Sequence, residues 1–402
     1  MAGKSFGPRA APALRLARQV TRACTPAGRA VIAACLGCWL LGLRLGWEEL
    51  FLVAACCGIA LVIAVAFVIG RPSLDISLEL DPSRVTVGTP AAGRMAATNR
   101  SRARLRPLSV ELPVGAGLAT FDIPSLGAGA SHDELFVVPT DRRCVIGVGP
   151  ARAVRTDPLG LLRRDAADPA ACELFVHPKI TALDSLTPGL QRDLEGQATR
   201  DLSTSDLAFH ALRDYVAGDD RRHVHWRSTA KTGKLVVRQY QDTRRLRLTV
   251  VIDGATASYR TEEEFELAMS VAGSICVRAA RDSQDVYLVA ASHAVSAASQ
   301  RRLLDTLARG TLADEGQGLA SLTARSARMA TDTSVLMLLT GSVLPFSAVK
   351  SATVYFGPDV KAMAIRMEPD APPGISRSAD LTVLAVRTLA DLPLLLNAAV
   401  NA

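Results

Sequence analysis

Acidic, basic and imidazole side chains crowd one stretch of this 402-residue chain, Phe209–Gln241. Its segment HVHW, residues 223–226, alternates as a short strand does, and every second residue of a strand faces the same way. Two imidazoles on one face, preceded by two neighbouring carboxylates in a turn that starts at Gly218, could share a metal ion. The candidate ligands are Asp219, Asp220, His223 and His225.

The same stretch supports two other interpretations. Its cations could capture an anion or a phosphate, but the frame GxxxxGK[ST] of a nucleotide-binding loop is missing. The interpretation that we favour is a structural clamp, in which buried carboxylate–guanidinium pairs and the ring of Trp226 lock the block against the following domain. The clamp surface could also take a partner. The candidate anion ligands are Arg221, Arg222, Arg227, Lys231 and Lys234, and the candidate clamp partners of the two carboxylates are Arg221, Arg222 and Arg238.

The stretch LRDYVAGDDRRHVHWRSTAKTGKLVVRQY resembles the signature of a bacterial family catalogued as domain of unknown function 58. Two upstream pieces, TDPLGLLRR at Thr156–Arg164 and HPK at His177–Lys179, are similar to further segments of that family. The family layout of two N-terminal spans, a sandwich-like segment, the signature and a terminal α/β domain covers nearly the whole chain. The signature positions that we single out for structure or partner binding are Arg213, Tyr215, Gly218, Asp219, Asp220, Arg222, Trp226, Lys231 and Arg238.

Strand-like and helix-like segments alternate over residues 244–402, which predicts a doubly wound, mainly parallel sheet. RLRLTVVID is a nearly continuous apolar strand that ends in Asp253, and an apolar helical repeat from Phe265 to Ala279 follows it. Ligands of such sheets bind at the carboxyl ends of the strands, where Asp253 and Thr340 lie. Further expected elements are the strands 285–291, 334–341, 361–367 and 381–386 and a basic helix over 299–309.

The family resemblance implies a von Willebrand factor type A-like fold for this last domain. That fold holds a divalent ion by Asp-x-Ser-x-Ser after its first strand, a Thr, and a later Asp. Here Ala255 and Ala257 replace both serines, and Thr340-Gly341 stands where an acidic residue is expected. Because Mg²⁺ needs hard oxygen ligands, we expect Asp253 to be a degenerate remnant that binds Mg²⁺ or Mn²⁺ no tighter than the millimolar range. We predict no resident cofactor and no catalytic residue.

Residues 73–183 read as short runs of period two separated by Gly, Pro and Asn, which predicts an antiparallel β-sandwich. Asn99-Arg100-Ser101 matches the N-glycosylation pattern, but the cytosolic location argued below leaves that match without meaning. The expected strands are Leu74–Leu80, Val85–Val87, Leu108–Val114, Glu134–Pro139 and Cys144–Pro150.

Two apolar runs, Ala30–Leu43 and Leu50–Gly70, come before the sandwich. The second run carries no charge and has the length of a bilayer core at helical rise, so we expect a transmembrane hairpin with its turn at Arg44–Glu49. A helix pair buried in a soluble core is the alternative. The positive-inside rule places both termini and the soluble domains in the cytoplasm and the protein in the plasma membrane. The basic residues before the first run are Lys4, Arg9, Arg15, Arg18, Arg22 and Arg29.

The composition agrees with an anchored cytosolic protein. The basic arm nearly accounts for the formal charge of +7, so we interpret it as a contact for anionic lipids rather than nucleic acid. Cysteines outside the apolar runs stand singly, which is typical of reduced thiols and of neither disulfides nor zinc. The expected domains are the arm 1–29, the helices 30–70, the sandwich 73–183, the signature block 184–243 and the α/β domain 244–402.

These observations favour a non-enzymatic, membrane-anchored scaffold or adaptor that presents its α/β domain to protein partners. Members of the family are commonly encoded beside a MoxR-type AAA+ ATPase and a transglutaminase-like membrane protein, so the resemblance implies partners of that kind. The competing hypothesis is a membrane-associated, metal-dependent hydrolase that uses the block Gly218–Trp226. The chain has no GxSxG, HExxH or Cys–His motif to support it.

Overall fold

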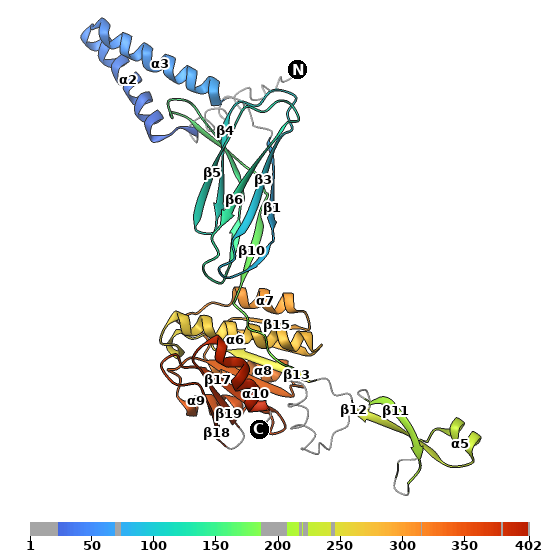
Figure 1. Ribbon diagram of the computed structural model, residues 1–402. Coiled ribbons are helices and arrows are strands. Elements are labelled where there is room, and N and C mark those ends of the chain that lie inside the picture. Colours follow the sequence, from blue (N-terminus) through green and yellow to red (C-terminus); the bar gives the residue numbers. More distant parts are fainter. Residues whose placement is uncertain are drawn as a thin grey trace, which may run out of the picture. The chain divides into compact units, whose positions relative to one another are not determined.

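The computed structural model describes residues 23–68, 74–185, 207–216, 219, 224–242, 246–314, 316–378 and 381–400, with the backbone alone described for 207–211 and 238–242. The chain divides into two compact units, Met1–Val176 and His177–Ala402 (Figure 1). The predicted fold class is confirmed: two N-terminal apolar helices, a β-sheet segment and a C-terminal, mostly parallel α/β sheet.

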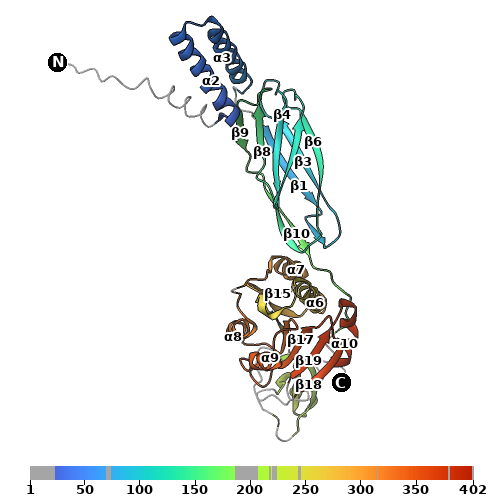
Figure 2. The same ribbon diagram turned by 90° about the vertical axis from the view of Figure 1, so that its left-hand side faces the viewer.

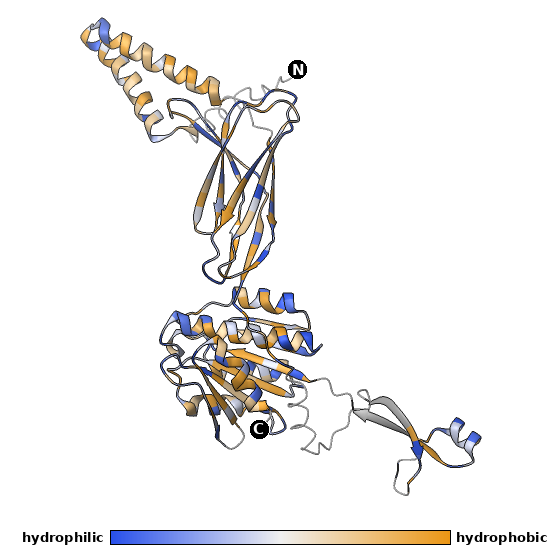
Figure 3. Cartoon of the chain, in the orientation of Figure 1, coloured by the Kyte–Doolittle hydropathy of each residue, from blue (hydrophilic) through white to orange (hydrophobic). Residues whose placement is uncertain are grey.

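The first unit begins with two antiparallel helices, α2 (Pro26–Leu45) and α3 (Glu48–Val68), which are apolar along their length (Figure 3). Gly46 follows α2 as its C-cap, and its left-handed φ of 67° suits a residue without a side chain. The rings of Trp39 and Phe51 meet edge to face at 5.4 Å between the helices. Both helices are long and apolar enough to cross a membrane.

The base of this hairpin is fixed to the β-sandwich (Figure 2). Thr25 caps α2 by accepting the N–H of Gly28 at 3.1 Å, and its own hydroxyl donates to the Gly160 carbonyl at 2.7 Å. Ala64 and Val68 of α3 share a small buried cluster with neighbouring leucines of the sandwich, Leu161 and Leu162. The apolar hairpin therefore continues directly into a folded domain.

The sandwich consists of two antiparallel sheets. One has the order β1-β3-β6, and the other has the order β2-β10-β7-β4-β8-β9 with β5 paired to β4. Alternate residues of the strands face a shared core, in which Met95 of one sheet and Leu112 of the other are fully buried. The strands are β1 (Leu74–Asp81), β2 (Arg84–Thr86), β3 (Ala91–Asn99), β4 (Leu108–Val114), β5 (Gly117–Ile123), β6 (Ser131–Val138), β7 (Cys144–Val148), β8 (Arg152–Thr156), β9 (Arg163–Ala167) and β10 (Cys172–His177).

Asn99, the residue of the glycosylation pattern, is a structural residue of this sandwich. Its side chain is fully buried, and its amide nitrogen donates to the carbonyls of Ala103, Leu126 and Gly127 at 2.9–3.1 Å. Its amide oxygen accepts from Ser101. A buried amide with this many partners is unavailable for modification and fixes the loop after β3.

The second unit contains a seven-stranded sheet in the order β15-β14-β13-β16-β17-β19-β18. The five inner strands are parallel, and the two edge strands run antiparallel to their neighbours. The strands are β13 (Arg247–Ile252), β14 (Asp285–Ala290), β15 (His293–Ala297), β16 (Val335–Thr340), β17 (Lys361–Met367), β18 (Gly374–Ser378) and β19 (Leu381–Val386). Of these, β15 and β18 were not expected from the sequence.

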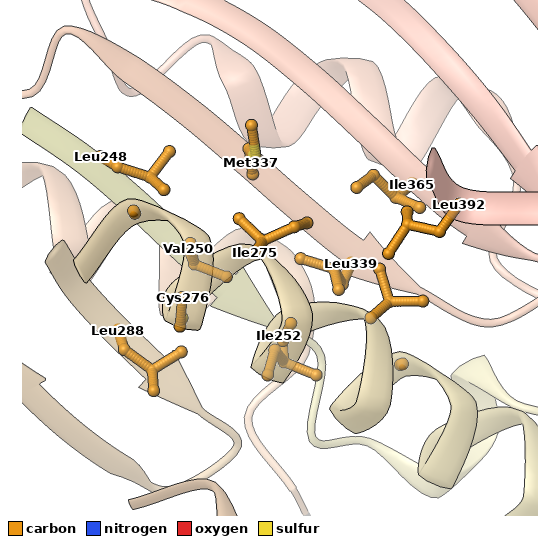
Figure 4. Close-up of a cluster of buried hydrophobic side chains, with 14 of the residues drawn as sticks. Leu248, Val250, Ile252, Ile275, Cys276, Leu288, Met337, Leu339, Ile365 and Leu392 are labelled. Carbon is orange, nitrogen blue, oxygen red and sulfur yellow. The ribbon is translucent and has the colours of Figure 1, made fainter. Parts of the chain in front are cut away.

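Helices cover both faces of this sheet, as its continuously apolar strands require. Val250 and Ile252 of β13 face α6, α7 and α10, whereas Val251 between them faces α8 and α9. Figure 4 shows Ile275 of α6 over the first of these faces. The helices are α6 (Glu262–Arg281), α7 (Gln300–Arg309), α8 (Leu319–Met329), α9 (Phe346–Thr353) and α10 (Leu392–Val400), with short 3₁₀ turns at Thr256–Ser258 and Leu389–Asp391.

The signature stretch forms a separate small element of the second unit. Strands β11 (Leu207–Asp214) and β12 (Val236–Asp242) pair as an antiparallel ribbon, and helix α5 (Trp226–Thr232) lies between them in sequence. The expected domain limits at 183 and 243 remain predictions.

Candidate functional site

The carboxyl ends of β13 and β16 bring together the two residues that sequence reasoning placed there. In the sheet, β14 lies on one side of β13 and β17 lies on the other side of β16, so the connections from these two neighbouring strands leave in opposite directions. Such a point is the switch point where ligands of doubly wound folds bind. Asp253 follows β13 and Thr340 ends β16, and both are fully buried. The Thr340 hydroxyl lies 3.3 Å from Asp253 Oδ2.

The carboxylate of Asp253 is held by its own loop. Oδ1 accepts the backbone N–H of Ala255 at 3.1 Å, and the hydroxyl of Ser258 also contacts the carboxylate. Burial raises the pKa of Asp253 above its usual value, and these hydrogen bonds oppose that rise only in part. The carboxylate thus serves as an acceptor within the loop.

Tyr259, which sequence reasoning did not single out, closes this site. Its hydroxyl donates to the backbone carbonyl of Asp253 at 2.9 Å, and its ring lies edge to face against Phe265 at 5.3 Å. Burial, with the nearby charges of Asp253 and Glu264, raises the pKa of Tyr259 well above its usual value. The phenol therefore stays protonated and acts as a donor at any physiological pH.

Glu264 is a second buried carboxylate at this edge that sequence reasoning missed. It is 2% exposed, and it accepts the Ser342 hydroxyl at 2.8 Å and the Arg260 backbone N–H at 3.0 Å. The residue stands in the run Glu262–Glu264, which reads as the usual acidic first turn of a helix. The polar turn after β16 was the only signal that it had a partner.

The packing around Gly341 leaves no room for an acidic side chain at this position. A Cβ added there would lie 2.4 Å from the Ser258 carbonyl oxygen and 2.6 Å from the Tyr259 ring. The space that a ligand side chain would need is filled by the loop after β13. Within the described residues, no three His, Cys, Asp or Glu side chains are grouped to hold a metal ion. The weak Mg²⁺ affinity expected at Asp253 remains a prediction.

In the signature ribbon, Asp219 pairs with an arginine other than those expected. Arg213 of β11 donates to both carboxylate oxygens of Asp219 at 2.7 and 2.8 Å, and the Val216 N–H donates to Oδ2 at 2.9 Å. The hydrogen bond from Arg213 lowers the pKa of Asp219. Arg213 is exposed, so this is a clamp at the surface, and the prediction of a buried clamp is wrong for this carboxylate.

Residues 224–226, the described part of the HVHW segment, form no strand, and this is a further correction. Val224 makes only a single bridge to Val237, and His225 is the N-cap of α5. Its Nδ1 lies 3.2 Å from the Ser228 N–H and 2.8 Å from the Ser228 hydroxyl. The short-range cap prevails over the apolar alternation because it satisfies backbone donors of the helix. The Nδ1 atom of His225 is thus engaged within α5.

Trp226 is the plainest correction. We expected a buried anchor, but its side chain is 67% exposed. The buried residues of this region are the small valines Val224, Val236 and Val237, of which the last two belong to β12. Arg227, Lys231 and Lys234 are exposed with it. The indole and the cations therefore form an exposed surface and do not serve as a buried anchor against the following domain.

The other signature positions are only partly described. Tyr215 is half-buried, and its backbone N–H donates to the Leu235 carbonyl at 2.8 Å. The backbone of Arg238 pairs with that of Leu212. Gly218, Asp220, Arg221, Arg222 and His223, together with the side chain of Arg238, lie outside the described residues. A role for this set in structure or partner binding remains a prediction.

These features define a class of protein: an apolar helical hairpin, a β-sandwich, a charged signature ribbon and a doubly wound α/β domain in one chain. Residues 211–331, from the signature ribbon to α8, match the family described as protein of unknown function DUF58. The resemblance drawn from the sequence is confirmed by this match.

No curated protein matches the chain in sequence. Among solved structures, a CARDB domain from Pyrococcus furiosus is similar at 15% identity and a TM-score of 0.21, over 26% of this chain and 88% of that one. A β-glucosidase from Listeria innocua is similar at 11% identity and a TM-score of 0.19, over 27% of this chain and 16% of that one. Likeness at this level says nothing of function.

Proposed function

We propose that the protein is a non-enzymatic, membrane-anchored scaffold or adaptor that presents its α/β domain to protein partners. The observation that supports this most is the α2–α3 hairpin. Its large apolar side chains point outward, including Leu52, 68% exposed, and Val62, 70% exposed. Leaving so much apolar surface in water would be costly, whereas a bilayer accepts it.

The orientation of the hairpin follows from charge. Residues 1–29 carry six basic side chains and no acidic one, whereas the end of α2 and the start of α3 have Arg44 against Glu48 and Glu49. The positive-inside rule favours a cytoplasmic arm and, after two crossings, a cytoplasmic sandwich and α/β domain. The protein then belongs to the plasma membrane, with both termini on the cytoplasmic side.

The α/β domain supports a binding role. Tyr259 fills the switch point of the sheet, and the loop after β13 packs closely against Gly341. Partners would therefore bind the outer surface of the domain, without a ligand at Asp253. The family resemblance suggests a MoxR-type AAA+ ATPase as the partner, in a system that includes a transglutaminase-like membrane protein. The hydrolase alternative would need His225 as a ligand, but that side chain caps α5.

The topology is tested by reporter fusions to the full chain. Green fluorescent protein fused after Ala402 should fluoresce, because it folds in the cytoplasm. Alkaline phosphatase inserted between Gly46 and Trp47, in the turn between α2 and α3, should be active, because it needs the outside of the membrane. Extraction of the full chain by alkaline carbonate, or the reverse reporter pattern, would contradict the anchorage or its orientation.

The partner is tested with the full chain in nanodiscs and a purified MoxR-type ATPase from the same genome. We expect a saturable complex in the presence of ATP. No saturable complex with or without nucleotide would refute this choice of partner.

A further inference from the structure

The end of the signature ribbon exposes an aromatic ring among cations. We call residues 226–235, which are helix α5 and the turn after it, the α5 tip. Trp226 is 67% exposed and Leu235 is 44% exposed. The cations of the tip are exposed as well, and they are Arg227, Lys231 and Lys234.

Charge of one sign extends beyond the tip along the sequence. From residue 221 to residue 241 there is no Asp or Glu. The cations in that range are Arg221, Arg222, Arg227, Lys231, Lys234 and Arg238. Such a segment attracts an anionic surface. Across the ribbon, the exposed Asp214 lies opposite Val236, and the three cations of the tip outnumber it.

Hydrogen bonds within the signature ribbon hold the tip in its fold, and this fold leaves the Trp226 ring exposed. The Val236 N–H donates to the Thr229 hydroxyl at 3.1 Å, and the His225 N–H donates to the Val236 carbonyl at 2.8 Å. Gly233, with a left-handed φ of 71°, ends the helix and turns the chain back. With 67% of its side chain exposed, Trp226 is available for an external contact.

An exposed indole beside several cations is typical of a protein segment that binds the interface of a bilayer. Tryptophan prefers the level of the lipid headgroups, and each Lys or Arg near an anionic leaflet strengthens binding roughly fivefold. We propose that the α5 tip binds the anionic cytoplasmic surface of the membrane. This inference rests on the proposed membrane anchorage and adds to it a second, reversible contact that involves the family signature.

Lipid suits the tip better than an acidic protein does. A tryptophan that anchors a protein interface needs a fitted pocket and a surrounding rim, whereas the flexible side chains of the tip match a diffuse layer of headgroup charge. The proposed anchor also keeps the membrane at a high effective concentration. Even a weak affinity for lipid would then suffice.

The test uses Trp226 as its own probe in the full chain. The chain has three tryptophans, so Trp39→Phe with Trp47→Phe leaves Trp226 as the only one. This protein is placed in nanodiscs of phosphatidylcholine, with or without phosphatidylglycerol, that carry brominated acyl chains near the headgroups. In the anionic discs we expect a blue-shifted emission, quenching by the brominated lipid and protection from acrylamide. In the neutral discs we expect none of these.

Charge variants test whether lipid binding depends on the cations of the tip or on the positive charge of the protein as a whole. Arg227→Gln with Lys231→Gln and Lys234→Gln should lower the ratio of bound to free tip roughly a hundredfold and abolish lipid quenching. The matched control changes three exposed cations on α7 and α9, Arg301, Arg302 and Lys350, to Gln and should leave quenching unchanged. Should the triple variant fold poorly, high salt applied to the unmodified tip should give the same loss.

Three results would overturn the proposal. One is an exposed Trp226 in both kinds of disc, and another is equal quenching in neutral and anionic discs. The third is protection of Trp226 by an added MoxR-type ATPase with no quenching by lipid, which would assign the tip to a protein. Failure of the anchorage itself would show separately, because the protein would then leave the discs or be extracted by alkaline carbonate.

Discussion

At the carboxyl edge of the α/β sheet, a few side chains determine whether the switch point is open or filled. Asp253 and Thr340 occupy the positions that a ligand site would use, but Tyr259 and Gly341 draw the loops together over them. The carboxylate is engaged by donors from its own loop. A position suited to ligand binding has thus become part of the core, where its polar groups satisfy one another.

Removing the Tyr259 hydroxyl tests this arrangement. Tyr259→Phe leaves the ring in place but deprives the buried Asp253 carbonyl of its donor, so we expect a loss of about 1–3 kcal/mol in the free energy of unfolding. Tyr355→Phe is the matched control, since Tyr355 is 52% exposed and should cost nothing measurable. The measurement is chemical denaturation followed by circular dichroism, and equal stabilities of the two variants would refute the role of the hydroxyl.

Trp226 should be dispensable for stability. Because its side chain is 67% exposed, Trp226→Ala should leave the melting temperature within error of the unmodified protein. Phe265→Ala is the contrast, because Phe265 is 3% exposed and its removal should cost about 3–5 kcal/mol. Thermal melts of the full chain in neutral nanodiscs compare the two, and a large loss for Trp226→Ala would restore the buried anchor expected from the sequence.

Among the elements, those that depend on burial could be predicted and those that depend on local capping could not. The apolar runs of β13 and β16 indicate strands covered on both faces, and the structure buries them so. Helix α5 was missed because it begins with a His cap and none of its own residues is buried, which leaves no apolar helical period. Glu264 was missed because a carboxylate in a first turn is ordinary until the Ser342 loop covers it.

The segment that follows β11 should depend on the ion pair between Arg213 and Asp219. Asp219→Ala removes the acceptor of both Arg213 and the Val216 N–H, so we expect hydrogen exchange in residues 213–219 to quicken several-fold. Arg213→Ala should do much the same, and the double variant little more, since the two side chains act together. Asp214→Ala, at an exposed neighbour, is the control. Unchanged exchange in Asp219→Ala would refute the clamp.

The same pair gives a pH dependence with a definite sign. Arg213 lowers the pKa of Asp219, so the pair's contribution is complete above the ordinary pKa of about 3.9. The contribution is lost as the pH falls through the lowered value. Exchange in residues 213–219 should therefore be insensitive to pH near neutrality, after correction for the intrinsic rate, and should quicken only in acid. Quickening between pH 5 and 7 would point to another group.

At the scale of the whole molecule, the chain consists of an apolar hairpin joined to a sandwich and of an α/β unit with a core of its own. The sandwich core is built around residues such as Leu112, and the α/β core around residues such as Ile275. Hairpin and sandwich share contacts at Thr25 and Leu161, so they make one unit. In the proposed scaffold, the first unit would serve as the membrane platform and the second as the domain that is presented to partners.

Separate cores predict separate unfolding. Leu112→Ala and Ile275→Ala each remove a fully buried side chain and should each cost about 2–5 kcal/mol, but in different units. In calorimetry of the full chain, Leu112→Ala should lower one transition and leave the other in place, and Ile275→Ala should do the reverse, because domains with their own cores unfold independently unless a large interface couples them. If either substitution lowers both transitions together, the two units are one cooperative body, and the division of the chain into platform and presented domain does not hold.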